Sequence, residues 1–497
     1  MIGPYLTKSR YLAGLQCSRR LWLIVNEPQP YEPPVPGSPM DVGQDIGRKA
    51  RLLFPGGVLL DEEPWRHSEA VSRTEALMAD ARVPAIFEAA FEFDGIRIRV
   101  DVLERLSDGA WGLREVKSST GLKERYLDEI ALQAYVLTSA SVALGSIELI
   151  HINTAYVRGP CGVDWTQLFA RLDLSATLAP RLLALPGRLP ALRDCLGETE
   201  LPHAAAGGQC GTPYPCEFWA RCTADKPVDW IARLPKLSSA RAAELTALGI
   251  DAISAIPFDF PLTPKQAIIR DAVVSGQPYV ARDLNRKLEP FGSPACYLDF
   301  EAMMPPIPLY EGARPYQTLP FQWSLHICEA DGSLLHREFL ADGSGDPRRE
   351  FATTLIEALA GASLPIVVYS AYERTQLRDL STLFPDLSDA LGAIIARLAD
   401  LLPVVRSAVY LREFEFSNSI KSVAPALCPT FSYDDLDGVA DGMAASGAFL
   451  RLASGAVADA GEAQELRRQL LAYCERDTLA MVETHRALKT LAASNQG

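Results

Sequence analysis

The sequence lacks three features that define large classes of proteins. It has no run of about eighteen apolar residues, so we expect no membrane span. Its first residues, MIGPYLTKSRYL, lack a basic segment followed by an apolar one, so no secretory signal is visible. It also lacks an excess of positive charge: the formal net charge is -14 at pH 7, which argues against a surface that binds nucleic acid non-specifically. We therefore expect a cytoplasmic protein without membrane contact.

The composition is that of a globular protein. The chain has 497 residues, of which 48% are hydrophobic and 22% are charged. This length predicts roughly two to four domains of about 100–200 residues each. Ten cysteines without a secretory signal indicate metal or redox use in a reducing compartment rather than a disulfide framework.

An Asp…Glu-x-Lys pattern lies in residues 96–117, IRIRVDVLERLSDGAWGLREVK, and consists of Asp101, Glu115 and Lys117. This arrangement is typical of metal-dependent nucleases. Two facing carboxylates can hold Mg²⁺ or Mn²⁺ through hard oxygen ligands. Such an ion polarises a phosphodiester, and Lys117 can orient the attacking water or stabilise developing charge. A solvated hairpin with a salt bridge is the alternative interpretation.

The geometry of this pattern depends on one turn. Alternation over residues 96–103 predicts a half-buried strand, and residues 111–117 predict a second one. Between them, residues 107–109 (SDG) have the composition of a turn with Gly in a left-handed conformation. A three-residue turn places Asp101 opposite Glu115 on one face of the ladder. A two-residue turn would move Asp101 to the other face.

Two further polar residues can belong to this site. Glu88 precedes the hairpin, and it can reach the metal or be an exposed strand residue. Gln133 lies in a helix predicted over residues 123–140, where it can contact phosphate or the metal-bound water, or pack the helix on the sheet. We also predict a strand over residues 146–157 and helical structure, broken by prolines, over residues 164–196.

Cysteines cluster in the turn-rich segment GGQCGTPYPCEFWARC, which contains Cys210, Cys216 and Cys222 at five-residue intervals between successive cysteines. Together with Cys17 they provide four soft ligands, which suit a [4Fe–4S] cluster or zinc. The alternative is that these cysteines are buried without a ligand. The unclustered cysteines are expected in the core: Cys161, Cys195, Cys296, Cys328, Cys428 and Cys474.

These features together resemble a known family. Residues 1–230 are similar to RecB-like exonucleases of the PD-(D/E)XK superfamily, especially the CRISPR-associated exonucleases and the AddB nuclease domain. In those families one cysteine precedes the nuclease core and three follow it, so that an iron–sulfur cluster joins the first and last segments. The order Cys17, Asp…Glu-x-Lys, Gln133 and the three late cysteines is the same here. The tail is C-x5-C-x5-C instead of C-x2-C-x5-C, and the upstream helix DVGQDIGRKARLLF lacks the metal-ligating His of many members.

A helical junction is predicted over residues 231–290. Within it, LSSARAAELTALGIDAISAIP resembles a helix–hairpin–helix segment with Gly249 between two short helices. Such segments can contact a nucleic-acid backbone through main-chain N–H groups, and a plain helical linker is the alternative.

A second set of carboxylates lies in residues 291–497. Asp299 and Glu301 share one face of a predicted buried strand, ACYLDFEA. Tyr473 and Asp477 are four residues apart and share a face of the predicted last helix. Glu373 follows a predicted strand, and it is either a metal ligand or the last residue of a helix-capping box that begins at Ser370.

This half resembles the DnaQ-like, RNase H-fold 3′–5′ exonucleases of the DEDD type. Their sites use D-x-E on the first strand, an acid in the middle and Y-x3-D on the last helix, which Asp299, Glu301, Tyr473 and Asp477 match. Glu373 stands where Asp is usual, and Asp400 is a second candidate for that place. The segment SIKSVAP resembles the family's S-L-K-x-V-A. The resemblance implies that the four carboxylates bind two divalent metals and that Tyr473 positions the attacking water.

The sequence therefore predicts an α/β protein with a restriction-endonuclease-like domain, a helical junction and an RNase H-like mixed sheet flanked by helices. The pairing of both halves resembles an uncharacterised bacterial family of RecB-like/DnaQ-like fusions. The leading hypothesis is a metal-dependent nuclease with two active sites, acting on DNA ahead of RNA. The alternatives are a nucleic-acid-binding scaffold with decayed sites and an iron–sulfur or zinc-dependent regulator.

Overall fold

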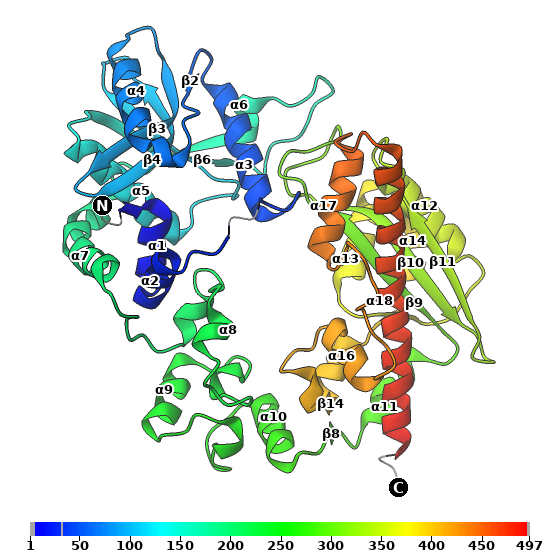
Figure 1. The fold of residues 1–497 in the computed structure, drawn as a ribbon. Coiled ribbons are helices and arrows are strands. Elements are labelled where there is room, and N and C mark those ends of the chain that lie inside the picture. The colour runs from blue at the N-terminus through cyan, green and yellow to red at the C-terminus, as the bar shows by residue number, and fades with distance from the viewer. Residues whose placement is uncertain (1–4, 31–32, 495–497) are drawn as a thin grey trace. The chain divides into compact units, whose positions relative to one another are not determined.

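The computed structural model describes residues 5–30 and 33–494 and shows a mixed α/β fold (Figure 1). The chain divides into two compact units. Unit 1 comprises Met1–Val35, Pro39–Asp225 and Pro305–Tyr316, and unit 2 comprises Pro36–Ser38, Lys226–Met304 and Gln317–Gly497. Within the described residues, no helix is long and apolar enough to cross a bilayer.

Unit 1 is built on a mixed sheet with the strand order β2-β3-β4-β5-β6-β7, and the short strand β1 pairs in parallel with β4. The β3–β4 and β4–β5 pairs are antiparallel, whereas β5 and β6 are parallel. The strands are β1 (Leu6–Thr7), β2 (Val58–Leu59), β3 (Ala85–Phe93), β4 (Ile96–Arg105), β5 (Trp111–Val116), β6 (Leu144–Ile152) and β7 (Phe169–Asp173).

Helices cover both faces of this sheet. An apolar core that includes Ile130 and Leu137 joins α5 to one face, and a second core around Ile46 and Ala50 joins α3 to the other. The helices of unit 1 are α1 (Lys8–Gln16), α2 (Ser18–Asn26), α3 (Pro39–Ala50), α4 (His67–Ala79), α5 (Glu124–Ser139), α6 (Trp165–Leu168), α7 (Ala179–Gly197) and α8 (Trp219–Cys222).

The hairpin between β4 and β5 has the predicted turn. The amide of Leu106 donates to the carbonyl of Ala110 at 2.9 Å, so residues 107–109 form the loop, and Gly109 has a φ of +84°. Val102 pairs with Arg114, and this register places Asp101 level with Glu115. The prediction of a three-residue turn is confirmed.

Two predicted elements differ in the structure. Phe169–Asp173 is not helical but forms the edge strand β7, paired antiparallel to β6 through Leu172 and Leu149. The predicted strand over residues 146–157 begins at Leu144 and ends at Ile152. The helical prediction failed at β7 because edge pairing with a distant strand, rather than local periodicity, determines that conformation.

Unit 2 contains a second mixed sheet with the strand order β11-β10-β9-β12-β13. Strand β9 is antiparallel to β10 and parallel to β12. A separate antiparallel pair joins β8 and β14. The strands are β8 (Tyr279–Val280), β9 (Ala295–Met303), β10 (Leu319–Cys328), β11 (Leu334–Leu340), β12 (Ile366–Val368), β13 (Leu398–Asp400) and β14 (Val409–Tyr410).

The two faces of β9 pack against different helices. Cys296, Leu298 and Phe300 belong to an apolar core with helices α12, α13 and α14, whereas Asp299 and Glu301 alternate with them toward α18. The helices of unit 2 are α9 (Ser239–Ala247), α10 (Pro264–Ser275), α11 (Leu284–Leu288), α12 (Arg348–Ala358), α13 (Tyr372–Leu383), α14 (Ser388–Ala396), α15 (Leu402–Ala408), α16 (Ile420–Leu427), α17 (Gly442–Ala453) and α18 (Ala460–Ser494).

The predicted junction begins unit 2. Helix α9 ends at Ala247, and Gly249 has a φ of +73°. The second predicted helix is only a single 3₁₀ turn, Ile253–Ala255, so the segment does not contain two α-helices around Gly249.

Candidate metal centres

Site 1 lies where strands β4 and β5 separate. The β4–β5 pairing ends at Val102, and β4 pairs with β1 at Ile96. The edge of β4 between these two positions is therefore open. Asp101 lies in this gap, and its Oδ2 accepts a hydrogen bond of 2.7 Å from the amide of Val116. The carboxylate thus replaces a missing ladder hydrogen bond and is held beside the end of β5.

Two lysines and two more carboxyl-bearing side chains complete site 1, which we define as Asp101, Glu115, Lys117, Glu129 and Lys8. The Nζ of Lys117 lies 2.6 Å from Glu115 and 2.9 Å from Glu129. The Nζ of Lys8 lies 3.6–3.8 Å from the carboxylates of Asp101, Glu115 and Glu129. Site 1 therefore holds three carboxyl groups and two ammonium groups.

Gln133 supports this site as a neutral donor. It is fully buried on α5, and its side-chain amide donates to Glu115 at 2.7 Å. Glu129 lies one helical turn earlier on the same face of α5, where it pairs with Lys117 and Lys8. Lys8 and Glu129 were not predicted, because only the β1–β4 pairing and the packing of α5 bring them to the Asp…Glu-x-Lys residues.

The lysines determine the charge states in site 1. Burial alone would raise the pKa of Glu115. Lys117 and Lys8 nevertheless hold this pKa well below its usual range. Burial alone would lower the pKa values of Lys8 and Lys117, but the neighbouring carboxylates raise both. Burial and the nearby Glu115 raise the pKa of Asp101 to about 7. Burial and Glu115 also raise the pKa of Glu129, so the charges of Asp101 and Glu129 are stabilised less than that of Glu115.

A cleft of about 560 Å³ opens onto site 1. Helix α3 lines it with Gly43, Gln44 and Gly47, and the sequence of this helix contains no histidine. Glu88 also lines the cleft, in a strand position with a φ of +58°, and its carboxylate lies 3.3 Å from Arg51. Because Phe87 pairs with Val102, Glu88 is level with Asp101 on the neighbouring strand.

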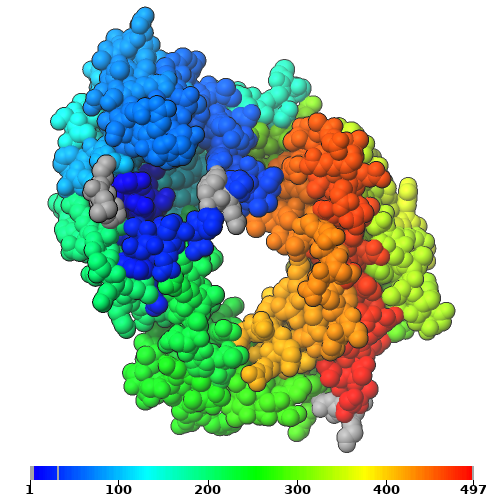
Figure 2. Space-filling model, viewed as in Figure 1, coloured from blue at the N-terminus to red at the C-terminus, as the bar shows by residue number. Residues whose placement is uncertain are grey.

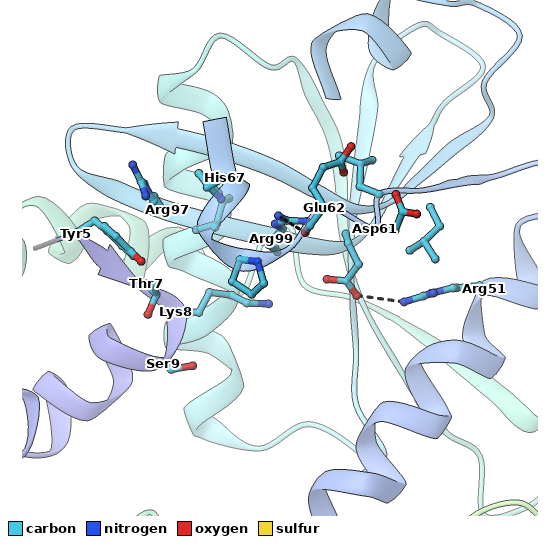
Figure 3. Close-up of a pocket in the computed structure, with 15 residues that line it drawn as sticks. Tyr5, Thr7, Lys8, Ser9, Arg51, Asp61, Glu62, His67, Arg97 and Arg99 are labelled. Atoms are coloured by element: carbon cyan, nitrogen blue, oxygen red, sulfur yellow. Dashed lines mark hydrogen bonds and ion pairs between the residues drawn. The ribbon is translucent and has the colours of Figure 1, made fainter. Parts of the chain in front are cut away.

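A second pocket shares Lys8, Arg51 and Glu88 with this cleft. Figure 3 shows Lys8 and Arg51 reaching into it from opposite sides, with a dashed line at the Arg51–Glu88 ion pair. Its other cationic side chains are Arg97, which lies over the ring of Tyr5, and Arg99. Cations beside an aromatic ring suit a phosphate backbone with unstacked bases.

Site 2 lies between β9 and α18 in unit 2, and we define it as Asp299, Glu301, Glu373, Asp477 and Tyr473. The four carboxyl groups influence one another's ionisation, and those of Glu301, Glu373 and Asp477 are buried. Cys474 is also present, with its Sγ 3.8 Å from the carboxylate of Asp299. The structure thus brings together all five residues that the sequence predicted.

Glu373 does not close a capping box. Helix α13 begins at Tyr372 with Ala371 as its N-cap and no side-chain cap. The Ser370 hydroxyl instead accepts from the amide of Tyr372 and donates to Glu373 at 3.3 Å. The Glu373 carboxyl contacts that of Asp299. By contrast, Asp400 lies at the end of β13, just before α15, and its Oδ1 accepts from the amide of Leu402 at 3.0 Å.

Site 2 contains little positive charge. Burial and the neighbouring Asp477 raise the pKa of Asp299 well above its usual range and that of Glu301 to about 8. Burial also raises the pKa of Glu373 to about 7. Lys421 acts on Glu301 and Asp477, and it donates to the carbonyl of Ala440 at 2.6 Å and lies over the ring of Tyr473.

Neutral hydroxyl groups hold Asp477. Tyr433 donates to its Oδ1 at 2.7 Å, and Tyr473 also forms a hydrogen bond with it. Burial and the adjacent carboxylates raise the pKa values of both tyrosines, which therefore remain donors. Tyr433 was not predicted, because it lies in a loop without a motif and is placed by the packing of α16 on α18.

The four clustered cysteines converge in unit 1. Cys17, Cys210, Cys216 and Cys222 line one small cavity between α1, α2 and the loop before α8. Gln16 stabilises this arrangement because its amide donates to the carbonyls of Gln209 and Tyr214 at 2.7 and 2.9 Å. The segment that carries Cys17 is thereby joined to the late cysteine loop.

The remaining cysteines were expected in the core, and this is correct for Cys195, Cys296 and Cys474. It is wrong for Cys161, which is exposed in a turn after β6, and for Cys328 and Cys428, which are partly exposed. Residue type alone does not determine burial, since these three lie at a turn or at the end of an element.

Part of unit 2 matches the model of a known protein family. A family model described as a domain of unknown function, DUF2779, matches residues 296–419. This region contains Asp299, Glu301 and Glu373 and ends before Lys421 and the helix that carries Tyr473 and Asp477. No curated protein matches the chain. Over residues 296–419, the chain is therefore similar to a family whose description assigns no activity.

Proposed function

We propose that the protein is a metal-dependent nuclease with two active sites, one in a restriction-endonuclease-like unit and one in an RNase H-like unit. The observation that carries the proposal is the convergence, in each unit, of predicted carboxylates from separate elements into one cluster. A hard divalent cation such as Mg²⁺ or Mn²⁺ prefers such oxygen ligands and would polarise a phosphodiester bound there.

In site 1, Asp101 and Glu115 would hold the cation. Lys117, fixed between Glu115 and Glu129, can orient a water or stabilise charge on the phosphate. Lys8 and the neighbouring Arg51, Arg97 and Arg99 provide positive charge for a nucleic-acid backbone, in an otherwise acidic protein.

In site 2, Asp299, Glu301, Glu373 and Asp477 would hold two cations. Tyr473 lies against Asp477 and can position a water through its hydroxyl. Because burial leaves these carboxyl groups without sufficient counter-charge, divalent cations would supply it.

The cysteine set fits a cofactor. A tetrahedral zinc with bonds of about 2.3 Å brings its sulfur ligands to about 3.8 Å from one another. Among the described residues, the groups of at least three ligating side chains with atoms within 4.8 Å do not include these cysteines. Four thiols around one cavity suit a [4Fe–4S] cluster, with zinc as the alternative, and either would join α1 and α2 to the loop before α8. A brown protein that contains iron after anaerobic purification, and a colourless Cys216→Ser variant, are expected.

The test of the proposal is cleavage of end-labelled single- and double-stranded DNA and RNA with Mg²⁺ or Mn²⁺. Asp101→Asn and Asp299→Asn each remove one carboxylate with little change in shape, and each is expected to reduce one cleavage activity by roughly 10³-fold. Matched controls are Asp108→Asn and Asp331→Asn, in exposed turns of the same units, where Asn can still accept the local backbone hydrogen bond.

The double variant Asp101→Asn/Asp299→Asn decides between two functions. A nucleic-acid-binding scaffold is favoured by one observation, namely that Lys8 lies near all three carboxylates of site 1. Cleavage by the double variant at the wild-type rate would overturn the assignment. Binding of the same substrates without metal-dependent cleavage by the wild type would identify a scaffold instead.

A further inference from the structure

Two histidines and a glutamate form a cluster in unit 2 outside site 2. His326 lies on β10 and pairs directly with His336 on β11, and Glu475 lies on α18. One ligand atom from each side chain lies within 4.8 Å of the others. The two imidazole centroids are 4.6 Å apart, and Nδ1 of His336 lies 3.6 Å from the Glu475 carboxylate.

Two hydroxyl groups hold the other nitrogen of each histidine. Nδ1 of His326 lies 2.8 Å from Oγ1 of Thr478, and Nε2 of His336 lies 2.9 Å from Oγ of Ser324. The Ser324 and Thr478 hydroxyls lie 2.8 Å apart. The Thr478 hydroxyl donates to the carbonyl of Glu475 at 2.9 Å.

The protons of this network can be assigned by counting. Because the Thr478 hydroxyl donates to the Glu475 carbonyl, its oxygen accepts from Ser324 and from Nδ1–H of His326. The Ser324 proton is then used, so Ser324 accepts from Nε2–H of His336. In this arrangement Nδ1 of His326 and Nε2 of His336 carry protons, and the other nitrogen of each ring, Nε2 of His326 and Nδ1 of His336, is left to face a metal ion.

This is the arrangement found around metal-binding histidines, where the second ring nitrogen donates to a neighbouring oxygen and fixes the tautomer. Burial lowers the pKa of His326 to about 4, which keeps its imidazole neutral at physiological pH. The Glu475 side chain is 48% exposed, so it can adjust its position. Figure 2 shows α18, in red, and the yellow-green β10–β11 region at the same surface of unit 2.

The ligand types distinguish this cluster from the two carboxylate sites. Imidazole nitrogens suit ions of intermediate softness, above all zinc, whereas all-oxygen sites suit Mg²⁺ or Mn²⁺. Three protein ligands leave a fourth position for water. We propose that His326, His336 and Glu475 bind one zinc ion that joins β10 and β11 to α18.

The position of this ion relates it to site 2 without making it part of that site. Ser324 pairs with Asp299 in the β9–β10 ladder, and Cys474 and Asp477 flank Glu475 on α18. By fixing α18 against β10 and β11, the zinc holds the helix that carries Asp477 in place. This role does not require that site 2 cleaves nucleic acid.

The test is a count of zinc ions in the full chain. Protein treated with a chelator is dialysed against Zn²⁺ in excess Mg²⁺, and bound zinc is measured by mass spectrometry. His336→Ala is expected to bind one zinc ion fewer per chain than the wild type. The control is His203→Ala, at an exposed loop position in unit 1, which is expected to retain the wild-type count. The cysteines and the carboxylate sites are present in all variants, so any zinc bound there adds equally to every count and does not affect the difference.

Two milder variants keep the test decisive if His336→Ala misfolds. Glu475→Gln removes a half-exposed ligand and Thr478→Val removes the acceptor of His326, and each is expected to weaken zinc binding by roughly 10–100-fold. Zinc is also expected to slow hydrogen exchange in β10, β11 and α18 of the wild type and not of Glu475→Gln. Equal zinc counts and affinities in the wild type, Glu475→Gln and Thr478→Val would overturn the proposal, whatever the outcome of the cleavage assays.

Discussion

The two carboxylate sites differ in how their negative charge is balanced. Site 1 in unit 1 contains Asp101, Glu115 and Glu129 together with the ammonium groups of Lys8 and Lys117. Site 2 in unit 2 contains four carboxyl groups, and Lys421 acts on two of them, Glu301 and Asp477. Site 1 contains its own counter-ions, whereas the negative charge of site 2 is balanced only when cations or protons are bound.

This difference has a consequence for each unit. In site 1 a divalent ion would compete with Lys8 for the same carboxylates, so we expect weaker metal binding there than in site 2. In site 2 the metal-free form retains protons, because burial and mutual repulsion raise the pKa values of Glu301 and Glu373 to about 8 and about 7. Metal binding there must release those protons.

The largest expected effect is that of Lys8→Met on metal-free unit 1. The substitution keeps the length of the side chain but removes the ion-pair partner of Asp101 and leaves Lys117 as the ammonium group of the site, so we expect a loss of about 3 kcal/mol in the free energy of unfolding. Urea denaturation with and without Mg²⁺ measures it. Mg²⁺ should restore most of the loss, because the ion takes over the role of the ammonium group.

The matched control for this prediction is Lys123→Met, an exposed lysine just before α5. It should change the stability by less than about 0.5 kcal/mol. Equal losses in the two variants would mean that Lys8 does not balance the charge of site 1, and the contrast between the sites would disappear.

The second prediction concerns metal and pH in unit 2. At a Mn²⁺ concentration about 100 times its dissociation constant, unit 2 should gain about 2.7 kcal/mol in stability. Metal-free unit 2 should lose stability as the pH rises from about 4.5 to about 8, since carboxyl groups with raised pKa values bind more protons when folded than when unfolded in this range. Hydrogen exchange of α18 reports both changes.

Asp299→Asn sharpens this prediction because it removes one of the repelling charges. The variant should be more stable than the wild type without metal at high pH, and it should lose the stabilisation by Mn²⁺. A wild-type response to Mn²⁺ in Asp299→Asn would show that the ion binds elsewhere.

The smallest expected effect is the loss of stability when one neutral hydrogen-bond donor is removed from site 1 or from site 2. Gln133→Leu removes the amide that donates to Glu115, and Tyr433→Phe removes the hydroxyl that donates to Asp477. We expect a loss of about 1 kcal/mol for Gln133→Leu, because Lys117 and Lys8 still bind Glu115. Tyr433→Phe should cost about 2 kcal/mol in metal-free protein, since no lysine among the described residues donates a hydrogen bond to Asp477 that could replace the lost hydroxyl, and Tyr473 is then its remaining hydroxyl donor. Thermal unfolding of both variants measures the difference, and a larger loss for Gln133→Leu would reverse the comparison.

The local sequence pattern was sufficient to predict the relative placement of residues that lie close together along one hairpin, one strand or one helix. The turn at residues 107–109 determines that Asp101 is level with Glu115, and strand alternation places Asp299 and Glu301 on one face. The spacing of Tyr473 and Asp477 does the same on α18. In each case the periodicity of the backbone fixes the direction of the side chains.

Local pattern failed where a distant partner decides the structure. Phe169–Asp173 has no strong preference of its own and is a strand because it pairs with β6. Glu373 has the spacing of a capping box, but its carboxyl group contacts Asp299 instead. Local hydrogen bonds and tertiary contacts compete for the same side chain, and sequence spacing does not reveal which one prevails.

By itself, the sequence therefore determined the two carboxylate patterns, the hairpin register and the set of clustered cysteines. Only the tertiary structure decided how their charge is balanced. Lys8 reaches Asp101 because β1 pairs with β4, and His336 meets Glu475 because α18 lies across β11. The physical reason is that side-chain direction follows from local backbone geometry, whereas the counter-charge of a buried group depends on which distant elements pack against it.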